Sequence, residues 1–314
     1  MPVTDERLAK LTDRLETGIK DLYESGRYAE YLAAMSKFHH YSFGNALLIL
    51  LQCTTATYVA GYTTWRDTFA RQVRRGEKGI QILAPCQFRY VVEREKIDPD
   101  TGQIVYGRDR KPLTEKRRES ATRFKVATVF DISQTEGREL PNIGVPELTG
   151  EVADFAGVYS RLATLSPLPV EQGEVKGTAK GYTSFLENRI VIRPGMSQTQ
   201  TIKTLVHEIA HAKLHNPEGL TPEQRKQRRE KEVEAESVAY VVCQHFGIDT
   251  SDYSLGYVAG WSRGKELAEL KASLNVIHST AGEIINAIQP PPPELTRDEP
   301  SQEYRRKVKK TKRK

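Results

Sequence analysis

The chain has 314 residues, of which 38% are hydrophobic and 28% are charged, and its formal net charge is +6. This length accommodates one or two domains with their own cores, and the hydrophobic share excludes a wholly disordered chain. No apolar run is long enough to cross a bilayer, and the first residues lack the pattern of a secretory signal. We therefore expect a cytoplasmic protein that makes no contact with a membrane.

The net charge is concentrated at one end of the chain. Residues 301–314 contain eight Lys and Arg and one Glu, a local charge of +7, which leaves −1 for the other 300 residues. An argument for a nucleic-acid partner must therefore rest on local patches and not on overall basicity. We interpret 289–314, which begins with four prolines after Gln289, as a disordered tail that adds little to the fold and binds polyanions nonspecifically.

The N-terminal half begins with a helical pattern. Apolar residues recur at three- and four-residue steps over the first 35 residues, which predicts two helices separated at Gly26. A third helix is expected from Ser42, a residue type that caps helices, to Gln52.

Short strands and turns follow the third helix. We expect, in order, a β-like segment at 57–60, a short helix at 64–73, a turn at 74–79, a strand at 80–83 stopped by Pro85, and strands at 88–92 and 125–130. The intervening residues 93–122 are strongly charged. We interpret them as an exposed excursion, either a hairpin or a loop, with little core of its own.

The C-terminal half is mainly helical. We expect helices at 152–165, 198–215, 222–246 and 264–288, with a strand or hairpin at 181–193. The Pro- and Gly-containing residues 141–150 indicate a linker. The fold class predicted is α+β, with an N-terminal α/β module over 1–140 and a mainly helical domain with a small sheet over 151–288.

The strongest chemical signal is the run His207-Glu208-Ile209-Ala210-His211. Residues four apart share one face of a helix, so both imidazoles can reach one metal ion. Glu208 can accept a proton from a water molecule that such a metal activates. Two histidines and a glutamate on a largely apolar helix are costly to bury without a metal or hydrogen-bond partners.

A catalytic zinc site needs a third protein ligand, and the next helix offers candidates. Glu232 and Glu236 are four residues apart and share a face, whereas Glu234 points elsewhere. One of that pair is expected to bind the metal and the other to orient a ligand histidine. The alternative is a solvated acidic helix start. His215 lies two turns from His207, too far to ligate the same ion, and is assigned to capping or to contact with a ligand.

Two resemblances follow from these and other motifs. The stretch from His207 to His215, followed by the acidic helix from Glu232, resembles the ImmA/IrrE-type zinc metallopeptidase domain of the gluzincin class. The N-terminal half is similar to the single-stranded DNA-binding domain of ArdC-like antirestriction proteins from conjugative plasmids, on motifs at 41–45, 59–65, 73–80 and 129–135. The excursion 93–122 and the tail lie outside both resemblances.

The first resemblance implies one Zn²⁺ per chain, bound by His207, His211 and a downstream glutamate, with Glu208 as the general base. Glu232 is preferred as the third ligand, because gluzincins place the metal-binding Glu four residues before an acidic or amide residue, here Glu236. Glu234 directly precedes an alanine, as in the Glu-Ala pair common in the ImmA/IrrE type, so it stays an alternative ligand.

The second resemblance fits a local basic and aromatic cluster. Residues 66–89 carry six Lys and Arg against two acidic residues, and cations with aromatic rings are what single-strand binding needs. Trp65 and Phe69, four residues apart, are equally compatible with a core stripe. The candidate DNA-binding residues are Tyr41, Ser42, Asn45, Tyr62, Trp65, Arg71, Arg74, Arg75 and Lys78.

The leading hypothesis is an antirestriction-type protein of a mobile element, which binds single-stranded DNA and carries a zinc-dependent metallopeptidase-like domain that acts on a protein substrate. One alternative is a cytosolic zinc protease of a protein partner such as a repressor. Another is a non-catalytic DNA-binding protein with structural zinc. A structural site is normally closed by four protein ligands, and the sequence offers three convincing ones, which favours an open catalytic position.

Overall fold

The computed structural model describes the chain except residues 1–2, 25–26, 100, 109, 141–153, 223–224, 249–261, 263–264 and 290–314. The described residues fall into two compact units. One contains the residues up to Glu16 together with Leu51–Arg138, and the other contains Thr17–Leu50 with the described residues from Glu139 onward. The sequence-based linker at 141–150 and nearly all of the tail lie outside the described residues, so the domain boundaries stay predictions.

The first unit contains the start of α1 (Val3–Glu24) and most of the strands. Its elements are β1 (Val59–Gly61), α4 (Tyr62–Asp67), β2 (Arg71–Val73), β3 (Ile80–Glu95), β4 (Thr114–Asp131), the 3-10 turn η1 (Ile132–Gln134) and β5 (Thr135–Gly137). One sheet has the order β1-β4-β3, and β2 pairs with β5. All pairs in these two sheets are antiparallel.

Two residues organise the interior of this unit. Trp65 is 0% exposed, and its indole N–H donates to the Phe130 carbonyl oxygen over 2.9 Å. Asp131 is also buried, and its carboxylate accepts hydrogen bonds from the backbone N–H groups of Thr57, Tyr58 and Ser133. A buried carboxylate is tolerable when backbone donors satisfy it in this way.

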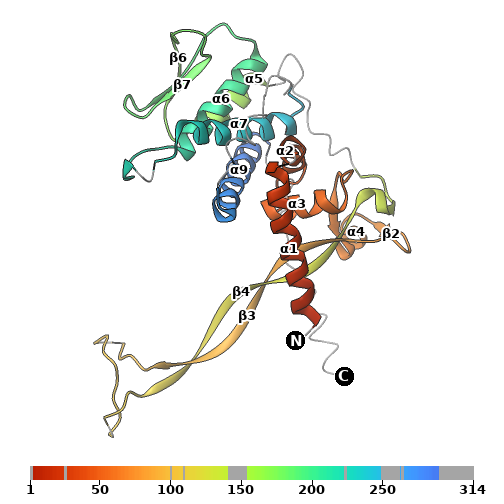
Figure 1. The fold of residues 1–314 in the computed structure, drawn as a ribbon, viewed down its shortest axis with the longest axis vertical. Coiled ribbons are helices and arrows are strands. Elements are labelled where there is room, and N and C mark those ends of the chain that lie inside the picture. The colour runs from red at the N-terminus through yellow and green to blue at the C-terminus, as the bar shows by residue number, and fades with distance from the viewer. Residues whose placement is uncertain are drawn as a thin grey trace. The chain divides into compact units, whose positions relative to one another are not determined.

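Three predicted elements differ from the structure here. The predicted helix at 64–73 ends at Asp67, because residues 71–73 pair with β5 instead. The strand predicted to stop before Pro85 continues to Glu95, since β3 is an edge strand, where a missing N–H is tolerated. The excursion at 93–122 is a hairpin, in which β3 and β4 pair in register from Ile80↔Val129 to Glu95↔Thr114 and form a long twisted ribbon (Figure 1).

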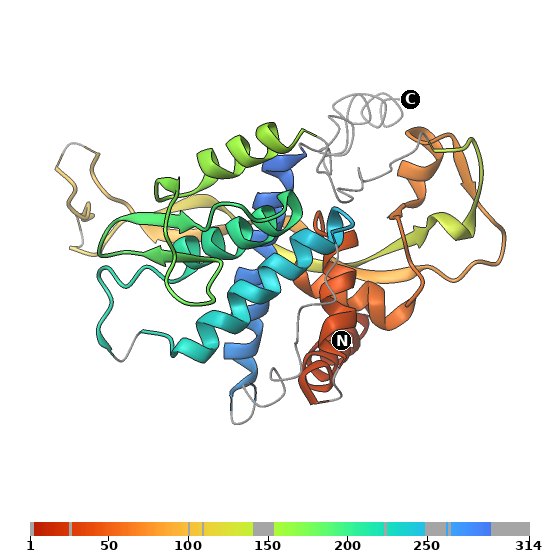
Figure 2. The same ribbon diagram turned by 90° about the horizontal axis from the view of Figure 1, so that it is seen from above.

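The second unit holds most of the helices and a small sheet (Figure 2). Its elements are the end of α1, then α2 (Tyr28–Lys37), α3 (Phe43–Gln52, up to Leu50), α5 (Phe155–Leu165), β6 (Val170–Gln172), β7 (Gly181–Ser184), β8 (Arg189–Ile192), α6 (Gln198–Leu214), α7 (Arg228–His245) and α9 (Leu267–Ile288). The sheet order is β6-β8-β7, so β7 is an edge strand antiparallel to β8. These elements confirm the α+β class.

Buried contacts join the early helices of the second unit to α7. The Tyr28 and Ser237 hydroxyls lie 2.9 Å apart, and His245 Nδ1 lies 2.7 Å from the Ser36 carbonyl oxygen. Residues 17–50, which the sequence analysis placed in the N-terminal module, therefore share a core with C-terminal residues. Of the helices in the described part of the chain, none combines the length and apolar character that a membrane span needs.

Four histidines gather where α2, α7 and α9 meet. The His39 ring lies 3.8 Å from that of His40 and 4.7 Å from that of His245, measured between centroids. His278 on α9 is buried, and its Nε2 has no hydrogen-bond partner, nor has Nδ1 of His39. Burial lowers the pKa of His278 to about 4, and burial together with the neighbouring histidines lowers the pKa of His39 to about 3.

This cluster predicts acid sensitivity of the fold. An unfolded histidine titrates near pH 6.5, so between about pH 4 and 6.5 the unfolded chain binds a proton that folded His278 does not. The free energy of unfolding must then fall as the pH is lowered through this window. His278→Asn keeps an amide in place of the ring Nδ1 but cannot titrate. In this variant we expect the slope of the free energy of unfolding against pH to decrease by up to about 1.4 kcal/mol per pH unit.

Urea unfolding of both proteins in chelator, at several pH values, measures the two slopes. Chelator keeps metal ions off His207 and His211 in both proteins, so that metal release does not contribute to either slope. Equal slopes would show that His278 titrates normally in the folded chain.

Candidate metal centre

The two histidines of the HExxH run lie on α6. The helix begins after Ser197, whose hydroxyl accepts a hydrogen bond from the Gln200 backbone N–H over 3.2 Å. Leu205, Val206 and Ile209 are fully buried, which fixes one face of α6 in the core. His207 and His211 lie one turn apart, and both side chains are largely buried.

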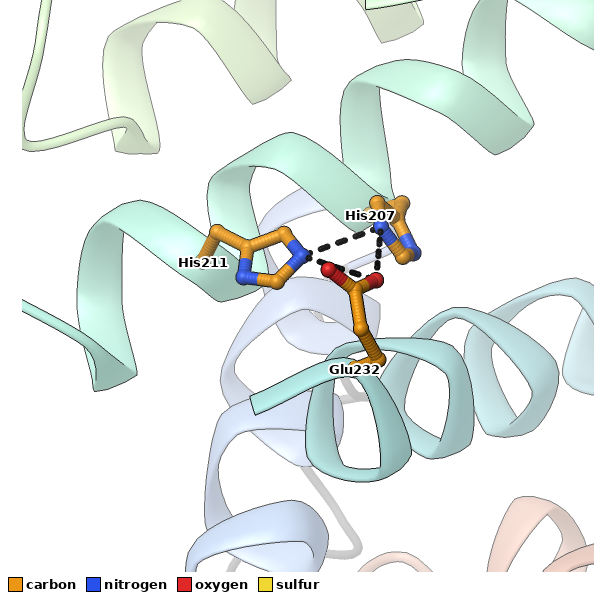
Figure 3. Close-up of side chains that lie close together, drawn as sticks. All are labelled: His207, His211 and Glu232. Carbon is orange, nitrogen blue, oxygen red and sulfur yellow. Dashed lines mark hydrogen bonds and ion pairs between the residues drawn. The ribbon is translucent and has the colours of Figure 1, made fainter. Parts of the chain in front are cut away.

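Glu232 on α7 faces both imidazoles (Figure 3). The Nε2 atoms of His207 and His211 lie 3.1 Å apart, and Oε2 of Glu232 lies 3.7 Å from the first and 3.6 Å from the second. One ligand atom from each residue can be chosen so that all lie within 4.8 Å of one another. Four ligands about 2.1 Å from a zinc ion lie about 3.4 Å apart at the corners of a tetrahedron, so this spacing fits such an ion.

The Glu208 side chain lies beside β7 and bonds a residue of that strand. Its carboxylate Oε2 accepts a hydrogen bond from the Thr183 hydroxyl of β7 over 2.8 Å, and the same hydroxyl lies 3.0 Å from the Glu208 carbonyl oxygen. Burial raises the pKa of Glu208, although the Thr183 hydrogen bond opposes this effect. A carboxylate with a raised pKa is suited to accept and return a proton. Sequence reasoning missed Thr183, because nothing in a short strand marks which hydroxyl will face a distant helix.

A chain of hydrogen bonds continues behind His211. Its Nδ1 lies 2.9 Å from Nδ1 of His215, and Nε2 of His215 lies 3.0 Å from Oε2 of Glu234. Lys226 in turn donates to both oxygens of Glu234, over 2.6 and 2.7 Å. His215 therefore caps α6 and contacts the rear of His211, as the sequence analysis expected.

Glu234 is the innermost member of this chain, with its side chain 0% exposed. Burial alone would raise the pKa of Glu234, but the hydrogen bonds from His215 and Lys226 outweigh it and hold the pKa below its usual range. Groups that bond the far nitrogen of a metal-binding histidine fix its tautomer and orientation. Lys226 was missed at the sequence level, because it precedes α7 and its partner lies eight residues on.

Glu236 was expected to orient a ligand histidine, and the structure gives that role no support. Its Oε2 is buried without a hydrogen-bond partner. Burial and the nearby Glu232 raise the pKa of Glu236 to about 7. Of the three acidic candidates on α7, Glu232 meets both imidazoles, Glu234 meets His215, and Glu236 lines a separate cavity of about 350 Å³ with Lys203 and His207.

A larger cavity lies over the three ligand candidates. It measures about 620 Å³, and its lining includes the three of them with Glu208, Tyr182 and Phe185. Gly181 allows β7 to approach α6, because a Cβ there would lie 2.8 Å from the Thr204 side chain. An edge strand therefore borders the cavity together with two helices.

Some of the candidate DNA-binding residues of the first unit make hydrogen bonds that hold the fold together. Arg71 and Arg74 belong to this group. The Arg71 guanidinium donates to the Thr135 side chain and to the backbone carbonyls of Thr135, Gly137 and Arg138. Arg74 bonds Glu77 and the Ser133 carbonyl oxygen. Arg71 therefore ties β2 to β5, and Arg74 holds the loop at 74–79 against η1.

Tyr62, Arg75 and Lys78 are exposed in the same unit. Trp65, by contrast, is a core residue in contact with Tyr58 and Phe69. This burial contradicts the prediction that Trp65 stacks on bases and favours the core-stripe alternative.

The remaining three candidates belong to the second unit. The Ser42 hydroxyl accepts the Asn45 backbone N–H over 3.3 Å, as the predicted helix cap should. Asn45 is buried, and Tyr41 is half-buried with its ring edge against Phe38.

Two successive segments of the chain match known families. Residues 2–130 match the family described as the N-terminal domain of the anti-restriction factor ArdC, and residues 165–257 match the family described as the IrrE N-terminal-like domain. The chain therefore has an N-terminal segment similar to the first family, here called the ArdC-type domain, and a later segment similar to the second, here called the IrrE-type domain. The later segment contains His207, His211 and Glu232.

Individual relatives are more distant. A protein of Bacillus anthracis, named as uncharacterized, is 28% identical over 320 residues, which cover 93% of this chain and 53% of that protein. This chain thus spans about half the length of that relative. Crystal structures of the antirestriction protein ArdC from plasmid R388, metal-free and Mn(II)-bound, are 21% and 18% identical, with TM-scores of 0.46 and 0.43. Each of these two matches covers 78% of this chain and 83% of the chain in the crystal structure.

The hydrogen-bond chain behind His211 predicts an effect on metal affinity. Glu234→Gln leaves His215 without its charged partner, and removal of such a partner costs about 10- to 100-fold in affinity. Competition with a chromophoric chelator measures the change. Lys226→Gln, at the half-exposed end of the chain, tests the same link with less risk to folding. Unchanged affinity in both folded variants would mean that the chain does not orient His211.

Proposed function

We propose that the IrrE-type domain is a zinc-dependent peptidase. The observation that carries this proposal is the convergence of His207, His211 and Glu232 beside the buried carboxylate of Glu208. Two neutral imidazoles and one carboxylate are the donor set of catalytic zinc sites, which keep a position open for water or substrate. Burial lowers the pKa of His207 to about 4, so its ring is neutral and its lone pair is available at neutral pH.

The residues present fit such an ion. When bound, a zinc ion supplies a Lewis acid that polarises a carbonyl group and lowers the pKa of water. Glu208, held by the Thr183 hydroxyl, accepts a proton from the attacking water molecule and returns it to the leaving amine. The donor–acceptor distance of 2.8 Å to Thr183 fixes one carboxylate oxygen and leaves the other for this exchange.

The substrate is proposed to be an extended peptide. Residues 181–183 of the edge strand β7 line the larger cavity, and an edge strand can pair with an added strand through its backbone N–H and C=O groups. Main-chain pairing of this kind would hold a peptide beside Glu208 without requiring one particular side chain.

A structural zinc site is the weaker alternative. Structural sites are closed by four protein ligands. Within the described residues, the converging donor atoms come from three residues, and the larger cavity borders all three. This arrangement supports an open position over a closed one.

Two substitutions separate metal binding from proton transfer. Glu208→Gln keeps the three ligands, so we expect about one zinc per chain and a loss of peptidase activity of about 10²- to 10⁴-fold. Glu232→Gln removes a ligand, so both zinc and activity should be lost. Glu230→Gln is the matched control, because Glu230 lies on the same helix and pairs with Lys265.

Elemental analysis and cleavage of a casein or peptide-library substrate provide the two measurements. Full activity in Glu208→Gln would rule out its role as the base, and full zinc retention in Glu232→Gln would rule out its role as a ligand.

We further propose that the ArdC-type domain binds single-stranded DNA and that the protein acts in antirestriction for a mobile element. Support comes from the family described as the N-terminal domain of an anti-restriction factor. Physical support comes from Arg75 and Lys78, which are exposed on the loop at 74–79, and from Tyr62, an exposed aromatic residue of the same unit. Phosphate contacts and base stacking together give binding with little sequence preference.

This proposal predicts the salt dependence of DNA binding. Arg75→Ala and Lys78→Ala should each lower the slope of log K against log salt by about 0.7, because each removes one phosphate contact with a single strand. Arg66→Ala is the control, since Arg66 is exposed in the same unit but pairs with Asp67 over 2.6 Å. Fluorescence anisotropy of the full chain with a labelled oligothymidylate, in chelator, gives these slopes. Equal slopes in all three variants would contradict phosphate contacts at this loop.

A further inference from the structure

The ribbon of β3 and β4 extends beyond the core of its own unit. Ile82 and Val129 are buried. Between them, every described residue from Leu83 to Thr128 is exposed or half-buried. Figure 1 shows this part as two strands that twist around each other. An isolated two-stranded hairpin is at best marginally stable in water, so a ribbon of this length without a buried face is suited to gain order from a partner.

The exposed side chains of the ribbon are of two kinds. Seven of the ten large hydrophobic side chains exposed in the described chain lie on the ribbon or on the segment that joins its strands. Phe88, Val91 and Phe124 lie on the strands, and Ile97, Ile104, Tyr106 and Leu113 on the joining segment. Residues 84–127 also carry eleven Lys and Arg against seven Asp and Glu, a net charge of +4. Exposed rings among excess positive charge fit a polyanion with planar groups.

The register separates two faces of the ribbon. Directly paired residues point to the same face, and residues two apart on one strand share a face. Phe88 pairs with Ala121, Tyr90 with Glu119 and Cys86 with Arg123, so Phe88, Tyr90 and Arg123 share one face, which we call the stacked face. Phe124 pairs with Pro85 and Arg118 with Val91, on the opposite face.

The rings of the stacked face are aligned. Phe88 and Tyr90 have centroids 6.0 Å apart and planes inclined by 18°. The Arg123 guanidinium lies 4.1 Å from the Phe88 centroid, a cation–π contact. The Tyr90 hydroxyl donates to Glu119 over 3.3 Å, and Glu119 also accepts from Arg94, which helps to hold the Tyr90 ring in place. Rings held in this way lose little freedom on binding a ligand.

The positive charge of this face is only partly balanced. Arg94 and Arg117 pair with Glu119 and Glu115. Arg123 and Lys125, which belongs to the same face, are exposed and have no ion pair within the described residues. Two cations therefore stand beside the aligned rings without a negative partner.

We propose that the stacked face binds single-stranded nucleic acid, with bases on Phe88 and Tyr90 and phosphates at Arg123 and Lys125. Same-face residues of a strand lie about 6.8 Å apart, and two planes that enclose one base also lie about 6.8 Å apart, because bases stack at about 3.4 Å. The ring centroids are 6.0 Å apart, so a base that enters between the rings must widen their separation by about 0.8 Å. The inference rests on the proposed DNA binding of this domain and assigns it a second surface, outside the loop at 74–79.

Single strands fit this face better than duplex. The ring faces of Phe88 and Tyr90 can stack only on bases whose own faces are free, and a duplex hides them. An acidic peptide would meet the cations but would leave the aligned rings without a planar partner.

The opposite face supplies matched controls. We compare Phe88→Ala with Phe124→Ala, since both rings are exposed on the same ribbon, 42% and 55% respectively, but on different faces. We likewise compare Arg123→Gln with Arg118→Gln. The full chain is titrated with a labelled oligothymidylate and with the matching duplex, in chelator. Phe88→Trp, which keeps a stacking ring, should bind like the unmodified chain and show quenched tryptophan fluorescence on binding.

We expect Phe88→Ala to weaken single-strand binding about tenfold or more, and Phe124→Ala to change it less than about twofold. Arg123→Gln should reduce the salt slope by about 0.7, and Arg118→Gln should leave it unchanged. Two results would overturn binding at the stacked face while the proposed DNA binding stands. In one, Phe88→Ala binds as tightly as the unmodified chain. In the other, Phe88→Ala and Phe124→Ala lose the same amount of affinity. Equal affinity for duplex, with the same loss in Phe88→Ala, overturns the single-strand assignment. No binding by the unmodified chain overturns the proposed DNA binding itself.

Discussion

Two imidazoles one helical turn apart, held inside an apolar interior, are the constraint on which the C-terminal unit depends. Burial lowers the pKa of His207 and so keeps its ring neutral, which metal binding requires. A metal-binding imidazole also needs a fixed orientation, which a bond to its far nitrogen provides. His215 provides that bond for His211, and Glu234 with Lys226 completes the chain. Glu232 contacts His207 and His211, while Glu234 contacts His215. These contacts together fix how far α7 is shifted along α6.

The centre of the site was predictable from the sequence because helix geometry is local. The spacing of His207 and His211 places both on one face wherever the helix lies. The choice among three acidic residues was harder, since Glu232 and Glu236 share a face of α7 and only packing against α6 separates them. Thr183 and Lys226 could not be found in this way, because their contacts with Glu208 and Glu234 join segments whose sequences carry no sign of the pairing.

In the N-terminal half, the sequence predicted the first three helices well, but it predicted the ribbon and the helix at 64–73 poorly. A helix that packs on a core shows apolar residues at regular steps, as the first two helices do. The ribbon has no buried face beyond Leu83, so nothing imposes an alternation of apolar and polar residues, and 93–122 resembled an excursion of undefined form. Trp65 illustrates the opposite ambiguity, because the same spacing fits a core stripe and a stacking surface, and burial decides for the core.

X-ray absorption at the zinc edge of the zinc-loaded chain tests the central claim most directly. The account predicts two imidazole ligands and oxygen ligands at about 2.0–2.1 Å, with one position that exchanges with an added small anion. In Glu232→Gln loaded with excess zinc, the carboxylate contribution should disappear. A sulfur shell at about 2.3 Å, or four protein ligands that no anion displaces, would contradict an open site formed by His207, His211 and Glu232.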